Sequence, residues 1–257
     1  MNDSLSRMLS QAYKNITTIR RNTFRLADIV VWPILYLFTL TFFVTYLGSD
    51  KSYLYMVILG MLGWRAMYFL NMDMVSSLTE EYWAKSLAYL FASPISRFEI
   101  AMGTALSGAL KGAFVIAIYL VLTNVLYGFT VPDWWLLAIG VLFLCLSGFT
   151  MGLFTLGLAY FYKEEAFNLS FILPDVIALL SGVYFSIDTV YPAAVVPFIR
   201  LLPTTQAFEL LKSMVGLGHA DYFMLVATSA VWLAAGYLFN GFMYERARKE
   251  GKLARLG

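Results

Sequence analysis

Residues 134–162 read WWLLAIGVLFLCLSGFTMGLFTLGLAYFY and contain no charged side chain. A helix that crosses the hydrocarbon core of a bilayer needs about 20 predominantly apolar residues. The stretch exceeds this length, and its apolar residues do not alternate with polar ones as in a strand of a membrane barrel. A segment in lipid must satisfy its own backbone hydrogen bonds, so we predict a membrane-spanning helix here.

The rest of the chain has a similar composition. Of its 257 residues, 60% are hydrophobic and only 13% are charged, whereas about a quarter of the residues in a soluble domain are charged. A net charge of +2 gives no indication of a nucleic-acid partner. The single cysteine, Cys145, and the single histidine, His219, provide neither a disulfide framework nor a metal site.

Apolar runs long enough to cross a membrane recur along the sequence. They cover residues 27–47, 53–75, 100–127, 134–162, 167–185 and 222–243. We therefore predict an all-α integral membrane protein with six transmembrane helices in one domain, residues 27–243. The two terminal segments and the connections on the same side of the membrane carry 13 lysine and arginine residues, whereas the opposite side carries three. By the positive-inside rule both termini, including the basic tail 244–257, are expected in the cytoplasm of a multi-pass inner-membrane protein.

Residues 1–26 precede the first run and show a helical period of apolar side chains. The residues on this predicted face are Leu5, Met8, Leu9, Ala12, Ile16 and Ile19. The pattern predicts an amphipathic helix on the anionic inner leaflet, or one docked on another protein. On the outer side, residues 191–215 contain Pro192, Pro197 and Pro203. A seventh span there would place the basic tail outside, so we expect two short outer or re-entrant helices, residues 193–202 and 205–215, with Pro197 and Pro203 acting as helix breaks.

The connection between the second and third spans is more structured than a simple link requires. Ser77-x-x-Glu80 and Ser96-x-x-Glu99 both fit a capping box, and Pro94 is expected to end a helix over residues 78–91. This helix either floats on the inner leaflet or docks on a cytoplasmic partner. Its candidate docking residues are Glu80, Glu81, Trp83, Lys85, Leu87 and Leu90.

Four ionisable residues fall inside the predicted spans: Arg65, Asp73, Lys111 and Asp175. A charge near the bilayer centre costs about 2.5–3.5 kcal/mol, so each side chain should face protein or water. They either form ion pairs that hold the bundle together, with Asp73 and Lys111 as a feasible pair, or line a transport path. Two glycine pairs, Gly108-x-x-x-Gly112 and Gly148-x-x-x-Gly152, predict close helix packing within the bundle or at a dimer face.

Four motifs occur in an order that resembles the type-2 ABC exporter permease family over essentially the whole chain. They are VVWPILYLFTLTFFV (residues 30–44), LFASPISRFEIAMG (90–103), LLSGVYFSIDTVYP (179–192) and LLPTTQAFELLK (201–212). The chain contains no G-x-x-x-x-G-K-[S/T] phosphate-binding loop, so we expect no catalysis within it.

The resemblance implies a partner for each unusual segment. The helix over residues 78–91 would be the coupling helix, seated on a separate nucleotide-binding ATPase subunit that binds ATP and Mg²⁺. Residues 4–25 would form an interface helix beside it, residues 191–215 would narrow the outer gate, and two copies would surround a central path. The substrate would be amphipathic or lipid-linked: a glycan, a lipid or a drug-like molecule. The alternative is a stand-alone ion-coupled carrier or channel that uses the four charges, for which inverted repeats are expected and not found.

Overall fold

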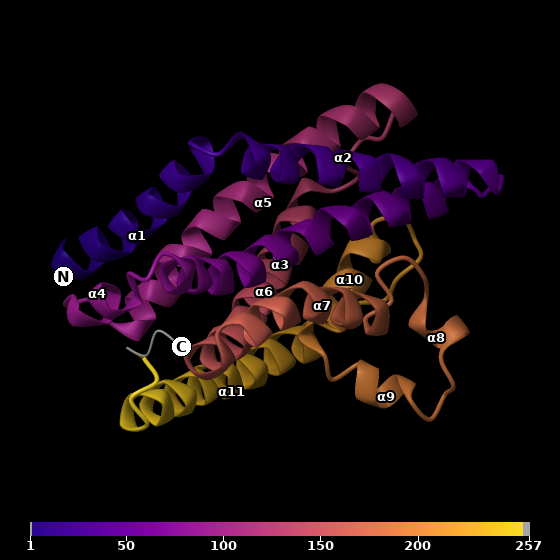
Figure 1. The fold of residues 1–257 in the computed structure, drawn as a ribbon. Coiled ribbons are helices and arrows are strands. Elements are labelled where there is room, and N and C mark those ends of the chain that lie inside the picture. Colours follow the sequence, from indigo (N-terminus) through magenta and orange to yellow (C-terminus); the bar gives the residue numbers. More distant parts are fainter. Residues whose placement is uncertain (1, 254–257) are drawn as a thin grey trace.

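The computed structural model describes residues 2–253, and these residues form an all-α bundle without strands. The helices that run along the bundle are α2 (Thr23–Tyr46), α3 (Lys51–Trp83), α5 (Arg97–Tyr127), α6 (Trp134–Tyr162), α7 (Glu164–Leu180) and α11 (Tyr222–Lys249). The other helices are α1 (Asn2–Arg20), α4 (Leu87–Ala92), α8 (Ile187–Val190), α9 (Val196–Ile199) and α10 (Pro203–Ser213). The start of α1, α4 and the end of α11 lie at one end of the bundle, opposite α8 and α9 (Figure 1).

Helix α3 occupies the centre, with α5 and α6 packed along it. Its residues between Met56 and Thr79 are almost all buried, although this segment includes an arginine and an aspartate. Both glycine pairs face α3 within the bundle. A Cβ on Gly148 would lie 2.4 Å from the backbone oxygen of Met67, and a Cβ on Gly108 would lie 2.6 Å from that of Phe69. The small residues therefore bring the backbones of α5 and α6 against α3.

Within residues 2–253, five helices are long and apolar enough to cross a membrane: α2, α3, α5, α6 and α11. They contain five of the predicted runs. The predicted run 167–185 corresponds to α7, which has 17 residues and ends at Leu180. At about 1.5 Å per residue α7 is about 25 Å long, at the lower limit for crossing the hydrocarbon core. It ends early because Gly182 adopts a left-handed φ of 64° and Val183 N–H bonds back to Ala178, as in a Schellman cap.

The structure differs from the expected helix over residues 78–91. Helix α3 continues without interruption to Trp83, so Ser77 is a buried residue of a helix interior and does not form a capping box. Residues 76–83 have helical backbone geometry throughout. The chain leaves this geometry just after α3, where Lys85 adopts a left-handed φ of 57°. Helix α4 then has only six residues. The second predicted capping box is confirmed: Ser96 Oγ accepts from Glu99 N–H, and the Glu99 carboxylate accepts from Ser96 N–H.

The outer segment also differs from the prediction. Pro197 and Pro203 occupy the first turns of α9 and α10, where the missing N–H of proline costs nothing, so they begin helices instead of breaking them. Pro192 lies in the connection between α8 and α9. Helix α10 corresponds to the predicted short helix 205–215 and is largely buried against α6, α11 and α3.

At the other terminus, residues 244–249 of the predicted tail continue α11 as a helix. Residues 254–257 and Met1 lie outside the described residues.

Candidate functional site

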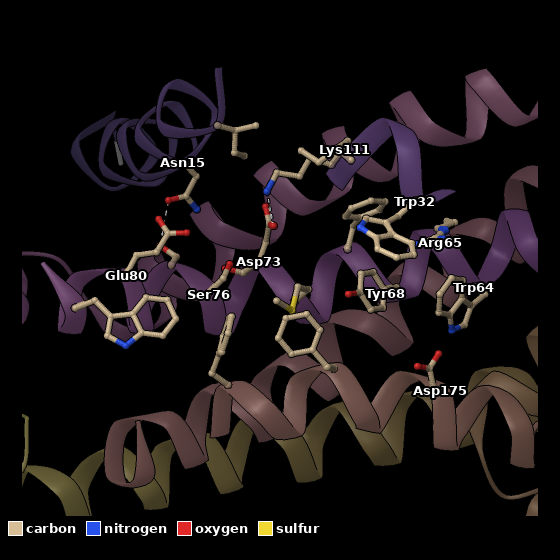
Figure 2. A pocket seen from close by; sticks show the side chains of 18 residues that line it. Asn15, Trp32, Trp64, Arg65, Tyr68, Asp73, Ser76, Glu80, Lys111 and Asp175 are labelled. Carbon is tan, nitrogen blue, oxygen red and sulfur yellow. Dashed lines mark hydrogen bonds and ion pairs between the residues drawn. The ribbon is translucent and has the colours of Figure 1, made fainter. Parts of the chain in front are cut away.

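A cavity of about 590 Å³ lies between α1, α2, α3, α5 and α7. Arg65, Asp73, Lys111 and Asp175 all line it, so the structure brings the four charges predicted inside the spans to one place (Figure 2). Its remaining surface is rich in aromatic rings, contributed by Trp32, Trp64, Tyr68, Phe69, Trp83, Phe167 and Phe171.

The Asp73 carboxylate and the Lys111 ammonium form an ion pair in the cavity wall. Lys111 Nζ lies 2.5 Å from Asp73 Oδ1, and the Ser107 hydroxyl donates to Asp73 Oδ2 over 2.8 Å. The Asp73 side chain is 5% exposed and that of Lys111 is 16% exposed. This contact joins α3 to α5 and satisfies both charges, as the sequence-based pairing predicts.

Arg65 lines the same cavity and lies on α3, about two helical turns before Asp73. Its Cζ lies 4.3 Å from the centroid of the Trp64 ring, and its Nε donates to the Tyr119 hydroxyl over 3.2 Å. The Tyr119 hydroxyl in turn donates to the Pro33 carbonyl over 2.6 Å. Arg65 is 5% exposed, so its charge is enclosed by aromatic rings and by the α2–α3–α5 contact. It does not form an ion pair with an acid of residues 2–253.

Asp175 differs from the other three charged residues. It follows Pro174 on α7, is exposed, and makes no hydrogen bond or ion pair within residues 2–253. Figure 2 shows its side chain directed from α7 into the gap beside Trp64. The Trp64 indole N–H is buried and also lacks a hydrogen-bond partner within the described part of the chain. An unpaired donor and an unpaired acceptor therefore face one gap.

A chain of buried hydrogen bonds connects this cavity wall to α1. Asn15 Nδ2 donates to Ser107 Oγ over 3.1 Å, and Ser107 is the residue that donates to Asp73. Ser77 Oγ donates to Asn15 Oδ1, and Gln11 Nε2 donates to Ser77 Oγ. Sequence reasoning did not identify these residues, because it considered only the apolar face of α1.

The predicted apolar face of α1 is divided between the bundle and the outer surface. Ala12 is buried, and Met8 and Ile19 are half-buried, but Leu5, Leu9 and Ile16 are exposed. The helix instead packs on α5 and α3 through its polar side. Two ion pairs fix this orientation: Arg7 with Glu99, at 2.7 Å, and Lys14 with Glu81.

The candidate docking residues around α4 separate into two groups. Five of them contact the rest of the protein or line its cavity: Glu80 lines the cavity, Glu81 binds Lys14 and Ser86, Trp83 donates to Glu164, Leu87 is buried, and Leu90 is half-buried. Lys85 is exposed, and Trp83 is 50% exposed. Tyr89, which the sequence analysis overlooked, is 79% exposed on α4.

The α6–α7 junction lies beside this end of α3. Lys163, between the two helices, places its ammonium 4.5 Å from the centroid of the Tyr82 ring. Burial lowers the pKa of Lys163, and the neighbouring Lys252 lowers it further. The junction between α6 and α7 thus contacts the same end of α3 that leads into α4.

At the opposite end, Lys212 holds the end of α7 against α10. Lys212 lies in the predicted short helix 205–215 and is 1% exposed. Its Nζ donates to the carbonyls of Gly182 and Phe185, at 3.1 Å each, and pairs with Glu209. Ser181 and Thr204 share a hydrogen bond of 2.5 Å nearby. The PTTQAFELLK motif thus has a structural role at this end.

The described residues contain no group of three histidine, cysteine, aspartate or glutamate side chains that could hold a metal ion. Residues 8–216 match the family model of the ABC-2 type transporter, so the match covers most of the chain. Comparison with individual curated proteins gives no match.

Proposed function

Because the chain belongs to the ABC-2 type transporter family, we propose that it is the membrane subunit of an ATP-driven exporter. As a permease it is a multi-pass membrane protein that transports and does not itself hydrolyse ATP. ATP and Mg²⁺ would be bound by a separate ATPase subunit. The distribution of lysine and arginine supports a location in the inner membrane, with the end that carries α4 in the cytoplasm.

The cavity between α1, α2, α3, α5 and α7 is the observation that supports a transport role most directly. Its volume of about 590 Å³ lies in the range of small-molecule sites. It combines intramembrane charges with a wall of aromatic rings, as an amphipathic substrate requires. We propose that two copies pair so that their cavities open toward a shared path, with α7 counted as the sixth crossing.

The surface at the other end of α3 supports docking of the ATPase. Lys85 and Tyr89 are exposed there, and Trp83 links α3 to the α6–α7 junction through Glu164. Closure of two ATPase subunits on ATP would push α4 and the end of α3. This push would move the bundle between inward-open and outward-open arrangements, which are the two states that alternating access requires.

Co-purification with an ATPase tests this proposal. The chain is expressed together with a Walker-motif ATPase encoded by a neighbouring reading frame and reconstituted in nanodiscs. We expect a stable complex whose ATP hydrolysis exceeds that of the ATPase alone, and no hydrolysis when the Walker lysine of the ATPase is replaced. If the two chains neither associate nor change the hydrolysis rate, the proposal is wrong. Transport driven by an ion gradient without any ATPase would favour a carrier instead.

A further inference from the structure

We propose that the part of the cavity around Asp175 binds an organic cation: an amphipathic molecule with a positively charged nitrogen or an equivalent onium centre. The role of this site in export depends on the proposed function, but binding of the cation does not.

The charges that line the cavity support a cation. Two of the lining side chains, Arg65 and Lys111, are basic, and three, Asp73, Glu80 and Asp175, are acidic. The two basic groups are already engaged. Lys111 is paired with Asp73, and Arg65 is 5% exposed between Trp64 and Tyr119.

Asp175 is therefore the accessible charge in this part of the cavity. Its side chain is exposed and makes no hydrogen bond or ion pair within the described part of the chain. An incoming anion would face this carboxylate and would find both basic groups covered. An incoming cation would gain an ion pair without breaking a direct hydrogen bond or ion pair of Asp175.

The neighbouring rings suit the apolar part of such a molecule. Trp32 on α2 is 63% exposed and Phe171 on α7 is 40% exposed, and both line the cavity together with Tyr68. Aromatic faces attract cations through their quadrupole, and they bury apolar groups at the same time. A carboxylate among aromatic rings therefore provides both the charge and the surface that an amphipathic cation requires.

The Trp64 indole N–H shows that the protein leaves this gap unfilled. Trp64 is 5% exposed, and its Nε1 has no partner within residues 2–253. In Figure 2 its ring edge and the Asp175 side chain point into the same space. Buried donors are normally paired in folded proteins, so an acceptor carried by the ligand is expected to complete this bond.

Binding of two probes with the same shape and opposite charges tests the inference. Tritiated tetraphenylphosphonium and tetraphenylborate are equilibrated with the full chain in nanodiscs, and displaceable binding is corrected for protein-free nanodiscs. We expect displaceable binding of the phosphonium cation and at least about tenfold weaker binding of the borate anion, as one ion pair in a partly buried site implies.

Three variants locate the site. Asp175→Asn should weaken binding of the cation about tenfold, and Asp175→Glu should restore most of it, because it keeps the charge. Asp50→Asn removes an exposed acid at the start of α3 that makes no capping hydrogen bond, and it should leave binding unchanged. Equal displaceable binding of the two probes, or an Asp175→Asn variant that binds like the parent chain, would overturn the inference.

The outcome separates this inference from the proposed function. A chain that associates with an ATPase but shows no preference for the cation would remain a permease with another substrate class. A chain that binds the cation through Asp175 but never associates with an ATPase would keep the site and lose the proposed function.

Discussion

Lys111 of α5 and Asp73 of α3 form an ion pair that also ends a hydrogen-bond chain from α1. Lys111 Nζ lies 2.5 Å from one carboxylate oxygen, while Ser107 donates to the other and accepts from Asn15. The charge that lines the cavity is thus fixed by a helix at the end of the bundle where the ATPase is proposed to dock.

Breaking this pair should destabilise the bundle. Lys111→Met leaves the Asp73 carboxylate buried without its cation, and we expect a loss of about 3–5 kcal/mol in the free energy of unfolding. The double variant Asp73→Leu/Lys111→Met removes both charges, and it should lose clearly less than the sum of the two single variants. Denaturant titration in mixed micelles measures each value. Additive losses would show that the two residues are not coupled.

The packing of α6 against α3 gives a second prediction, with a matched control in α5. Gly148→Ala places a Cβ 2.4 Å from the Met67 backbone oxygen, so the two helices must separate, and overpacking of this kind costs about 1–3 kcal/mol. Gly112→Ala places its Cβ at 3.4 Å from the nearest atom, Ala66 Cα, and should change stability little. The difference in thermal unfolding midpoint between the two variants measures the effect. Equal midpoints would contradict the close approach.

The long apolar runs made the helices predictable, because lipid leaves no alternative that satisfies the backbone. The end of α3 was not predictable in the same way. Ser77 fits a capping box in sequence, but it lies inside α3, where the preceding turn already bonds its backbone. Its hydroxyl donates to Asn15 of α1, so a tertiary contact takes the place of the predicted cap. The prediction that Pro197 and Pro203 break helices was also wrong, because a proline is equally compatible with the first turn of a helix.

The candidate site could be predicted in part. The four intramembrane charges were identified because lipid penalises them wherever they lie, and this argument requires no partner. The partners themselves depend on how the helices pack. Asn15 and Gln11 lie outside the predicted apolar face of α1, yet they are 7% and 5% exposed against α3 and α5. The burial of Lys212 in the predicted short helix 205–215 was not foreseen either, since periodicity does not reveal which face another helix covers.

Lys212 and Arg200 allow a comparison of a buried and an exposed ion pair near the same end of the bundle. Lys212→Met leaves Glu209, which is 13% exposed, without its cation and removes the donor to two carbonyls, so we expect a loss of about 3–5 kcal/mol. Arg200→Met breaks a pair with Asp188 in which both side chains are at least half exposed, and the loss should stay below about 1 kcal/mol.

The same denaturant titration measures both variants. If Lys212→Met is no less stable than Arg200→Met, the attachment of α7 to α10 does not depend on Lys212.

Tyr89 provides the most direct test of where the ATPase docks. It is 79% exposed on α4, while the neighbouring Leu87 packs inside the protein, so Tyr89→Ala removes contact surface without opening the core. Exposed tyrosines often contribute about 1–2 kcal/mol at protein interfaces, which predicts about tenfold weaker binding of the ATPase. Titration of the ATPase onto the immobilised permease measures this affinity, and stimulation of ATP hydrolysis should fall with it.

Tyr46→Ala is the matched control, because Tyr46 is 87% exposed at the end of α2, the helix that leads away from α1. It should leave affinity and stimulation unchanged, and both variants should insert into the membrane in the amounts of the parent chain. If Tyr89→Ala binds the ATPase as tightly as Tyr46→Ala does, α4 is not the docking element. The surface to test next would then be that of the half-exposed Trp83 and the α6–α7 junction, which lie beside α4 at the same end of α3.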